Sequence, residues 1–161
     1  MRDHTPSDAR RQRRPVGPPV APVFVDPAKF PDVYALTADG DCMGAELPNG
    51  AKLGFTTAER PRRGDIVVLW FRPGRVPAGP HQARVKRLVR EPPSWVSFPH
   101  QDVPGSEVEP FLAVEMTHPP RRFEIRCADL LAMHKFIGVI PPERLAWPKV
   151  PAEAVALDGR P

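Results

Sequence analysis

Proline is spread through almost the whole sequence and limits what this chain can fold into. The chain has 24 prolines in 161 residues, about three times the usual share of proline in proteins. Each proline fixes φ and lacks a backbone N–H, so it interrupts a helix and is excluded from a central strand. The proline pattern therefore excludes long helices and favours short strands joined by loops.

The apolar runs between the prolines predict these strands. The strongest is 66–71, six consecutive β-branched, aromatic or large apolar residues, which indicates burial on both faces. Residues 72–82 then predict a long hairpin loop, and 83–89 returns as the paired strand. Other strands are expected at 33–37, 53–57, 95–98, 111–116, 123–126 and 135–140.

Only two segments have helical character. Residues 42–47 predict a single turn that Asp41 is suited to cap, and residues 128–134 predict about two turns. The sequence therefore predicts a mostly-β domain with one or two short helices.

The two ends of the chain differ in composition from its middle. Residues 1–29 predict a flexible Pro/Arg-rich arm, 30–141 a single domain and 142–161 a loose C-terminal tail. The arm carries five arginines and two aspartates in its first 14 residues. Such a tail can hold phosphates, so a DNA-associated regulator that uses the arm is one hypothesis. The alternative is a solvated leader, since no aromatic residue lies among the arginines to stack on bases.

Other features concern the compartment and metals. No apolar run is long enough for a membrane span and no secretory leader is recognisable, so we expect a cytoplasmic protein without membrane contact. Cys42 and Cys127 are then expected as free thiols. A zinc site would need both cysteines together with two distant histidines, so we expect no metal and no other cofactor.

Residues 38–50 are less generic than their surroundings. They place Cys42 between two turns, Asp39-Gly40 and Pro48-Asn49-Gly50, with a predicted strand on either side. Glycine and asparagine supply the positive φ angles that such bends need. A thiol held in this way is presented to its surroundings.

The chemical partner for Cys42 is Lys86, in the strand after the long hairpin loop. A lysine amine acts as a general base only when neutral, and burial favours the neutral form. A deprotonated thiol is a good nucleophile. The two would form a nucleophile–base pair of the Ser-Lys type with sulfur in place of oxygen. The residues alone leave open that Lys86 lies on a solvated basic edge and that Cys42 is an inert packing residue.

Several segments, in order and spacing, resemble the LexA/UmuD family of self-cleaving peptidases. That family has a Gly-Asp-Ser-Met motif with the nucleophile, an Ile-Pro-Asp-Gly-Asp turn, Pro-Gly-Asp-Ile-Val-Val, and Val-Lys-Arg-Leu with the base. The matching segments here are GDCM at 40–43, LPNG at 47–50, RPRRGDIVV at 60–68 and VKRL at 85–88. The run FIGVI at 136–140 is similar to the closing strand of the family.

The resemblance implies a LexA/signal-peptidase-like fold, a partial barrel of bent strands. It implies Cys42 as nucleophile, Lys86 as base, a homodimer, and cleavage of the protein's own N-terminal arm or of a partner protein in a stress-response, phage or mobile-element setting. In that family cleavage is stimulated by the RecA filament. Cysteine stands here where the family has serine, and the family's Ala-Gly or Cys-Gly cleavage site is absent upstream. A non-catalytic dimerising or partner-binding module on the same fold is therefore the alternative hypothesis.

Overall fold

The computed structural model describes residues 24–79 and 81–141. Its helical elements are three short 3-10 helices: η1 (Pro27–Lys29), η2 (Gly44–Glu46) and η3 (Cys127–Asp129). Its strands are β1 (Val33–Thr37), β2 (Lys52–Thr56), β3 (Ile66–Phe71), β4 (Ala83–Arg90), β5 (Phe111–Thr117), β6 (Pro120–Arg126) and β7 (Leu130–Val139). The mostly-β prediction is confirmed.

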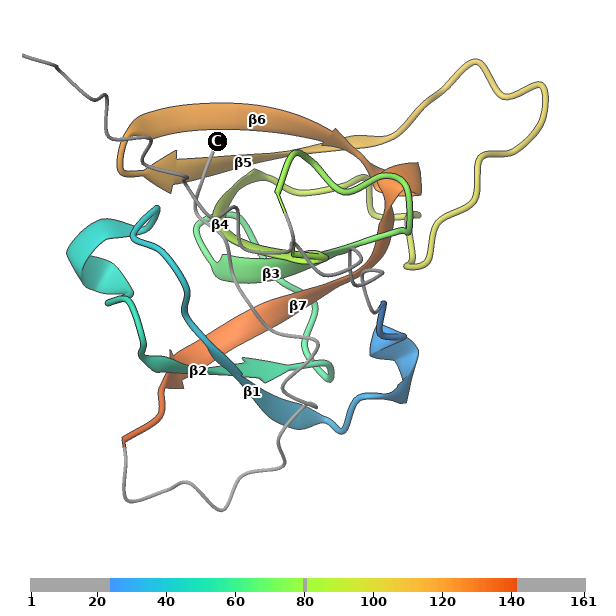
Figure 1. Ribbon diagram of the computed structural model, residues 1–161. Helices are drawn as coiled ribbons and strands as arrows, with labels where there is room; N and C mark the ends of the chain where they lie inside the picture. The colour runs from blue at the N-terminus through green and yellow to red at the C-terminus, as the bar shows by residue number, and fades with distance from the viewer. Residues whose placement is uncertain (1–23, 80, 142–161) are drawn as a thin grey trace, which may run out of the picture.

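The strands form one sheet in the order β1-β2-β7-β3-β4-β5-β6, with every neighbouring pair antiparallel. The last strand, β7, lies between β2 and β3, so it joins the N-terminal hairpin to the rest of the sheet (Figure 1). The register shifts within β2, β3 and β4. Such irregularities bend and twist strands, and Figure 1 shows the β5–β6 hairpin above β3 and β4, with β1 and β2 at the opposite end.

Strand β3 is buried on both faces, as its apolar run predicts. Val68 and Trp70 belong to one core cluster, while Val67 and Leu69 belong to another. Side chains of a strand alternate between its faces, so β3 lies between two cores. The first core collects residues of β1, β2 and the start of β4, and the second collects Leu88 of β4 with residues of β5 and η3.

The structure corrects the prediction of a helix at 128–134. Only Cys127–Asp129 is helical, as one 3-10 turn, and Leu130 begins the ten-residue strand β7. Leucine, alanine and methionine favour helices, but here residues 130–134 pair with β3, and β2 pairs with the later part of β7. Tertiary pairing therefore outweighs local propensity.

Two smaller expectations also fail. Residues 95–98 form turns and irregular structure rather than a strand, consistent with the prolines at 92, 93 and 99, which remove backbone donors. The helical turn after Cys42 is only η2, whose N-cap is Met43 without a side-chain hydrogen bond. Asp41 therefore does not cap it; instead, the Asp41 carbonyl accepts a hydrogen bond from Gly44 N–H.

A buried polar relay connects the first core to β7. Trp70 Nε1 donates to the Tyr34 hydroxyl at 3.0 Å, and the Tyr34 hydroxyl lies 2.7 Å from His134 Nδ1. Because an indole N–H can only donate, the Tyr34 oxygen accepts the bond from Trp70, whereas the direction of the bond between Tyr34 and His134 follows the tautomer of the imidazole. The ring of Phe30 covers Tyr34 and Trp70, with centroids 4.8 and 4.9 Å away.

The segment before Phe30 is held by Gln82, at the start of the β4 side of the hairpin. Its amide accepts from Val25 N–H at 2.8 Å and donates to Val25 C=O at 2.9 Å. These two bonds imitate a strand pair. Residues 24–30 therefore lie against the domain, while the remainder of the predicted arm and the predicted C-terminal tail lie outside the described residues.

Candidate functional site

Cys42 lies in the loop between β1 and β2, and the hairpin closes the base of this loop. Ala38 N–H donates to Ala51 C=O and Gly50 N–H donates to Ala38 C=O, both at 2.8 Å. Across the loop, Gly40 N–H donates to the Asn49 side chain at 3.0 Å. Gly40 has φ of 101° and Gly50 of 83°, values that L side chains rarely adopt. The two predicted turns are thus the means by which the loop is closed.

Lys86 reaches Cys42 from β4. Its Nζ lies 3.3 Å from Cys42 Sγ, and only 7% of Lys86 is exposed. The thiol also lies 3.8 Å from the carbonyl oxygen of Val85. Lys86 pairs with Val67, so the central strands fix its backbone. In the described part of the chain, Cys42 is the only hydrogen-bond partner of the Lys86 amine.

The turn between β5 and β6 fixes the backbone of Cys42. The Cys42 carbonyl accepts from Thr117 N–H at 2.9 Å and from His118 N–H at 3.0 Å. The Thr117 hydroxyl lies 3.4 Å from the same carbonyl. Two backbone donors from a separate hairpin limit the rotation of the Cys42 peptide, so the position of the sulfur depends on three parts of the sheet.

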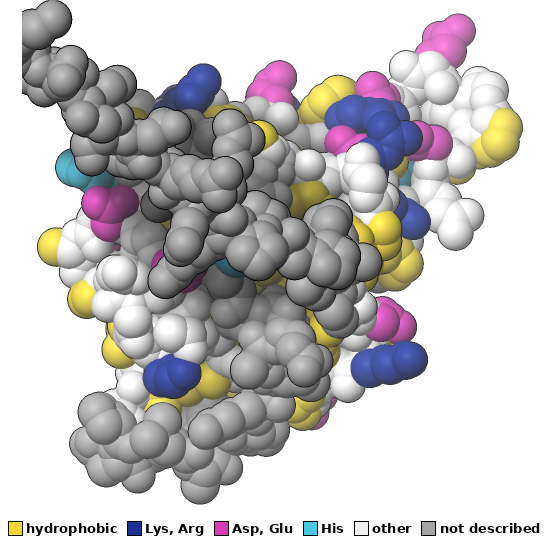
Figure 2. All heavy atoms as spheres, in the orientation of Figure 1, with side chains coloured by type: hydrophobic (Ala, Val, Ile, Leu, Met, Phe, Trp, Pro, Cys, Tyr) yellow, Lys and Arg dark blue, Asp and Glu magenta, His cyan; other side chains and the backbone are white. Residues whose placement is uncertain are grey.

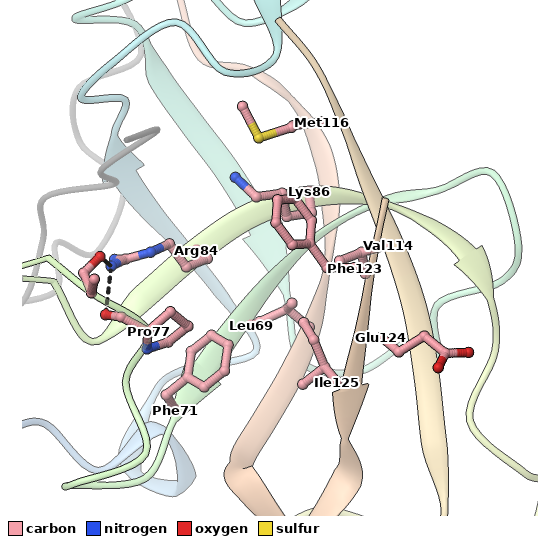
Figure 3. Close-up of a pocket in the computed structure, with 11 residues that line it drawn as sticks. Leu69, Phe71, Pro77, Arg84, Lys86, Val114, Met116, Phe123, Glu124 and Ile125 are labelled. Carbon is pink, nitrogen blue, oxygen red and sulfur yellow. Dashed lines mark hydrogen bonds between the residues drawn. The ribbon is translucent and has the colours of Figure 1, made fainter. Parts of the chain in front are cut away.

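An apolar groove runs from Lys86 along the space under the β5–β6 hairpin (Figure 3). Its volume is about 170 Å³. Figure 3 shows Lys86 between Met116 and the ring of Phe123 at one end, with Phe71 and Pro77 at the other. Glu124 points away from the groove. The groove can therefore accept an apolar side chain beside the amine.

Arg84 holds the loop that forms one wall of the groove. Its guanidinium donates to the carbonyls of Pro77, Ala78 and His81, at 3.3, 3.2 and 2.6 Å. Only 5% of Arg84 is exposed. Hydrogen bonds from a charged donor are stronger than neutral ones, so this arginine gives the long hairpin loop a defined position against β4.

Cys42 lines a separate, much smaller hollow of about 20 Å³. The β1–β2 loop forms most of its wall, with Val85 of β4 on the other side. This volume is about that needed by one water molecule. Two histidines flank the loop: His81 lies 3.6 Å from the carboxylate of Asp39, and His118 lies 3.9 Å from that of Asp41.

The structure brings Cys42 and Lys86 together and separates the second thiol from them. Cys127 is fully buried in the second core, where burial raises its pKa to about 11. Within 24–79 and 81–141, no three His, Cys, Asp or Glu side chains are grouped to hold a metal ion. The sequence identified Cys42 and Lys86 but not the Thr117–His118 backbone contacts, because backbone donors leave no signal in residue type.

The described residues include no helix that is long and apolar enough to cross a membrane. Comparison with protein-family models, with curated proteins and with solved structures finds no match to this chain.

Proposed function

We propose that this protein cleaves a peptide bond, in its own N-terminal arm or in a partner protein, with Cys42 as nucleophile and Lys86 as base. The observation that supports this proposal most directly is the 3.3 Å distance between Lys86 Nζ and Cys42 Sγ. It lies close to the hydrogen-bond reach expected of a nucleophile and its base. The same pair occupies the nucleophile and base positions implied by the resemblance to LexA and UmuD, whose bent partial-barrel fold we propose for the seven-stranded sheet.

The reaction would proceed in two stages. Lys86 takes the thiol proton as Cys42 Sγ attacks the carbonyl carbon, and then gives that proton to the leaving amine, which produces a thioester. Water, deprotonated by Lys86, then attacks the thioester and releases the acid and the thiol. If Cys42 ionises first, the resting pair is thiolate and ammonium, and Lys86 acts as the acid toward the amine. We assign the backbone N–H of Cys42 to the oxyanion.

Burial and the groove support this chemistry. Lys86 is only 7% exposed, so packing holds its amine in place beside the sulfur. The apolar groove ends at the same amine, so a substrate side chain placed there would bring its peptide bond to the sulfur. Fixed placement of reacting groups is itself a large part of catalysis.

The first test follows the intact mass of the purified full chain. We expect loss of an N-terminal fragment at neutral or alkaline pH, faster in the presence of an activated RecA filament, and no loss in Cys42→Ala. The matched control is Cys127→Ala, which removes the other thiol and leaves the pair in place. An unchanged mass of the wild type with and without RecA would reject self-cleavage. The proposal would then depend on cleavage of a partner protein, tested by adding that protein to the assay.

A second candidate function is a dimerising or partner-binding module without catalysis. The observation that favours it is the exposure of Ile137 and Val139, 42% and 48%, near the end of β7. Both belong to the last three residues of the strand, next to the register shift between β2 and β7. Exposed apolar side chains that lie close together are typical of protein interfaces.

This candidate predicts a homodimer that depends on those two side chains. Sedimentation equilibrium of Ile137→Lys/Val139→Lys should show a dimer dissociation constant at least about tenfold higher than that of the wild type, since charges are costly in a desolvated interface. The control is Val103→Lys/Val108→Lys. It introduces the same two charges at exposed valines of the β4–β5 loop, whose exposed fractions are 65% and 62%. Equal weakening in both variants, or a monomeric wild type, would contradict the prediction.

The DNA hypothesis concerns residues 10–14, which lie outside the described residues. Figure 2 shows basic and acidic side chains close together at one end of the visible face. Arg126 is an example of such pairing, since it contacts Asp102, Glu109 and Asp129. Binding of DNA through the arm stays a prediction.

A further inference from the structure

We propose that Cys42 is a peroxide-sensitive modification site, oxidised to a sulfenic acid with Lys86 as the proton donor. The inference uses the Cys42–Lys86 pair of the proposed function but goes beyond it, because oxidation does not require that the pair cleave peptides. It assigns to this pair a second substrate class, small hydroperoxides, and a reversible covalent change.

The first support is the environment of the Lys86 amine. It is buried at 7% exposure, and among the described residues the only hydrogen bond of Nζ is to Cys42 Sγ. The amine is therefore placed to give a proton to an oxygen that approaches the sulfur, which lies 3.3 Å away. This geometry provides a proton donor beside the sulfur for an attacked peroxide.

The second support is access of a small oxidant to the sulfur. Cys42 is half-buried and lines the hollow of about 20 Å³ on the β1–β2 loop. A molecule of the size of water fits such a volume, and hydrogen peroxide is the smallest hydroperoxide. The larger groove at Lys86 is a separate space lined by other residues. A peroxide can therefore reach the sulfur through the small hollow, while the groove proposed for a peptide side chain is a different space.

The step balances without any further reactant. The Cys42 sulfur attacks one oxygen of hydrogen peroxide, so an S–O bond forms and the O–O bond breaks. Hydroxide leaves and takes a proton from the Lys86 ammonium, which produces water and the neutral amine. The sulfur is oxidised by two electrons to Cys–SOH, and the peroxide is reduced to water.

Cys127 provides an internal comparison. It is fully buried in the second core, and burial raises its pKa to about 11. Low thiolate content and low access both protect a thiol from oxidation. A buried Cys127 also cannot serve as a resolving thiol for Cys42. Reduction must therefore come from a separate low-molecular-weight thiol, which forms a mixed disulfide and then releases Cys42.

The test treats the reduced full chain with hydrogen peroxide, traps sulfenic acid with a cyclic 1,3-dione and locates the label by peptide mass. We expect the label on Cys42, none on Cys127, and prevention of labelling when a small thiol is added after the peroxide. Lys86→Met should slow labelling of Cys42 at least about tenfold, because the departing hydroxide loses its proton donor. Arg87→Met, on the same strand, should leave the rate unchanged.

The outcomes separate this inference from the proposed function. A labelled Cys42 in a chain that cleaves no peptide upholds the inference and rejects the peptidase. Absence of label on Cys42, equal labelling of both cysteines, or the same labelling rate in Lys86→Met and wild type would overturn the inference, whatever the cleavage assay shows. A circular dichroism spectrum identical to that of the wild type ensures that a slower Lys86→Met reflects the amine and not misfolding.

Discussion

Replacing Lys86 by methionine is expected to lower peptide cleavage by about 10²- to 10⁴-fold, the usual contribution of a general base. Methionine has a similar length but no amine, so the sulfur of Cys42 loses the group 3.3 Å away that takes its proton. The folded state should be at least as stable as the wild type, because a buried amine is replaced by an apolar side chain. Rates of cleavage and urea unfolding of the same preparations measure the two effects separately.

The control for this variant is Arg87→Met. Arg87 follows Lys86 in β4 and is paired with Glu46 rather than with Cys42. An ion pair at the surface contributes only about 0–1 kcal/mol, so we expect normal cleavage and nearly normal stability. If Lys86→Met cleaves at the wild-type rate, Lys86 is not the base. If Lys86→Met and Arg87→Met both lose activity, the effect comes from the strand and not from the amine.

Acidification is expected to destabilise the protein through His134. Burial lowers the pKa of His134 from 6.5 to about 4, and its Nδ1 shares a hydrogen bond with the Tyr34 hydroxyl. Between these two pKa values the unfolded chain binds a proton that the folded chain does not, so stability falls as the pH falls from 6.5 to about 4. The loss by pH 4.5 should be about 2–3 kcal/mol of unfolding free energy. Urea unfolding at pH 7.5 and pH 4.5 measures it.

The matched variant for this prediction is His134→Asn. Asparagine does not titrate in this range and offers a carbonyl oxygen in place of Nδ1. Carboxylates that titrate near pH 4 affect both proteins, so the difference between the two pH dependences isolates His134. The variant should lose about 2–3 kcal/mol less than the wild type between the two pH values. Equal losses in the two proteins would show that His134 is not the group responsible.

Strand and turn positions in the N-terminal half could be predicted from the sequence because the signals there are local. Six apolar residues at 66–71 leave no polar face, so burial on both sides follows from composition alone. Gly40 and Gly50 mark turns because few other residues adopt their φ values. The segment 128–134 could not be assigned in this way, because its state depends on pairing with β3, which is more than 50 residues earlier in the chain.

The sequence by itself determined the mostly-β class, the two turns around Cys42 and the two residues proposed to react. Local rules of proline, glycine and apolar runs are sufficient for these. Only the tertiary structure decided that Lys86 is buried against the sulfur rather than solvated on a basic edge, and that the β5–β6 turn holds the Cys42 carbonyl. The physical reason is that these contacts join residues far apart in the chain, whose approach is set by the order and bend of the whole sheet.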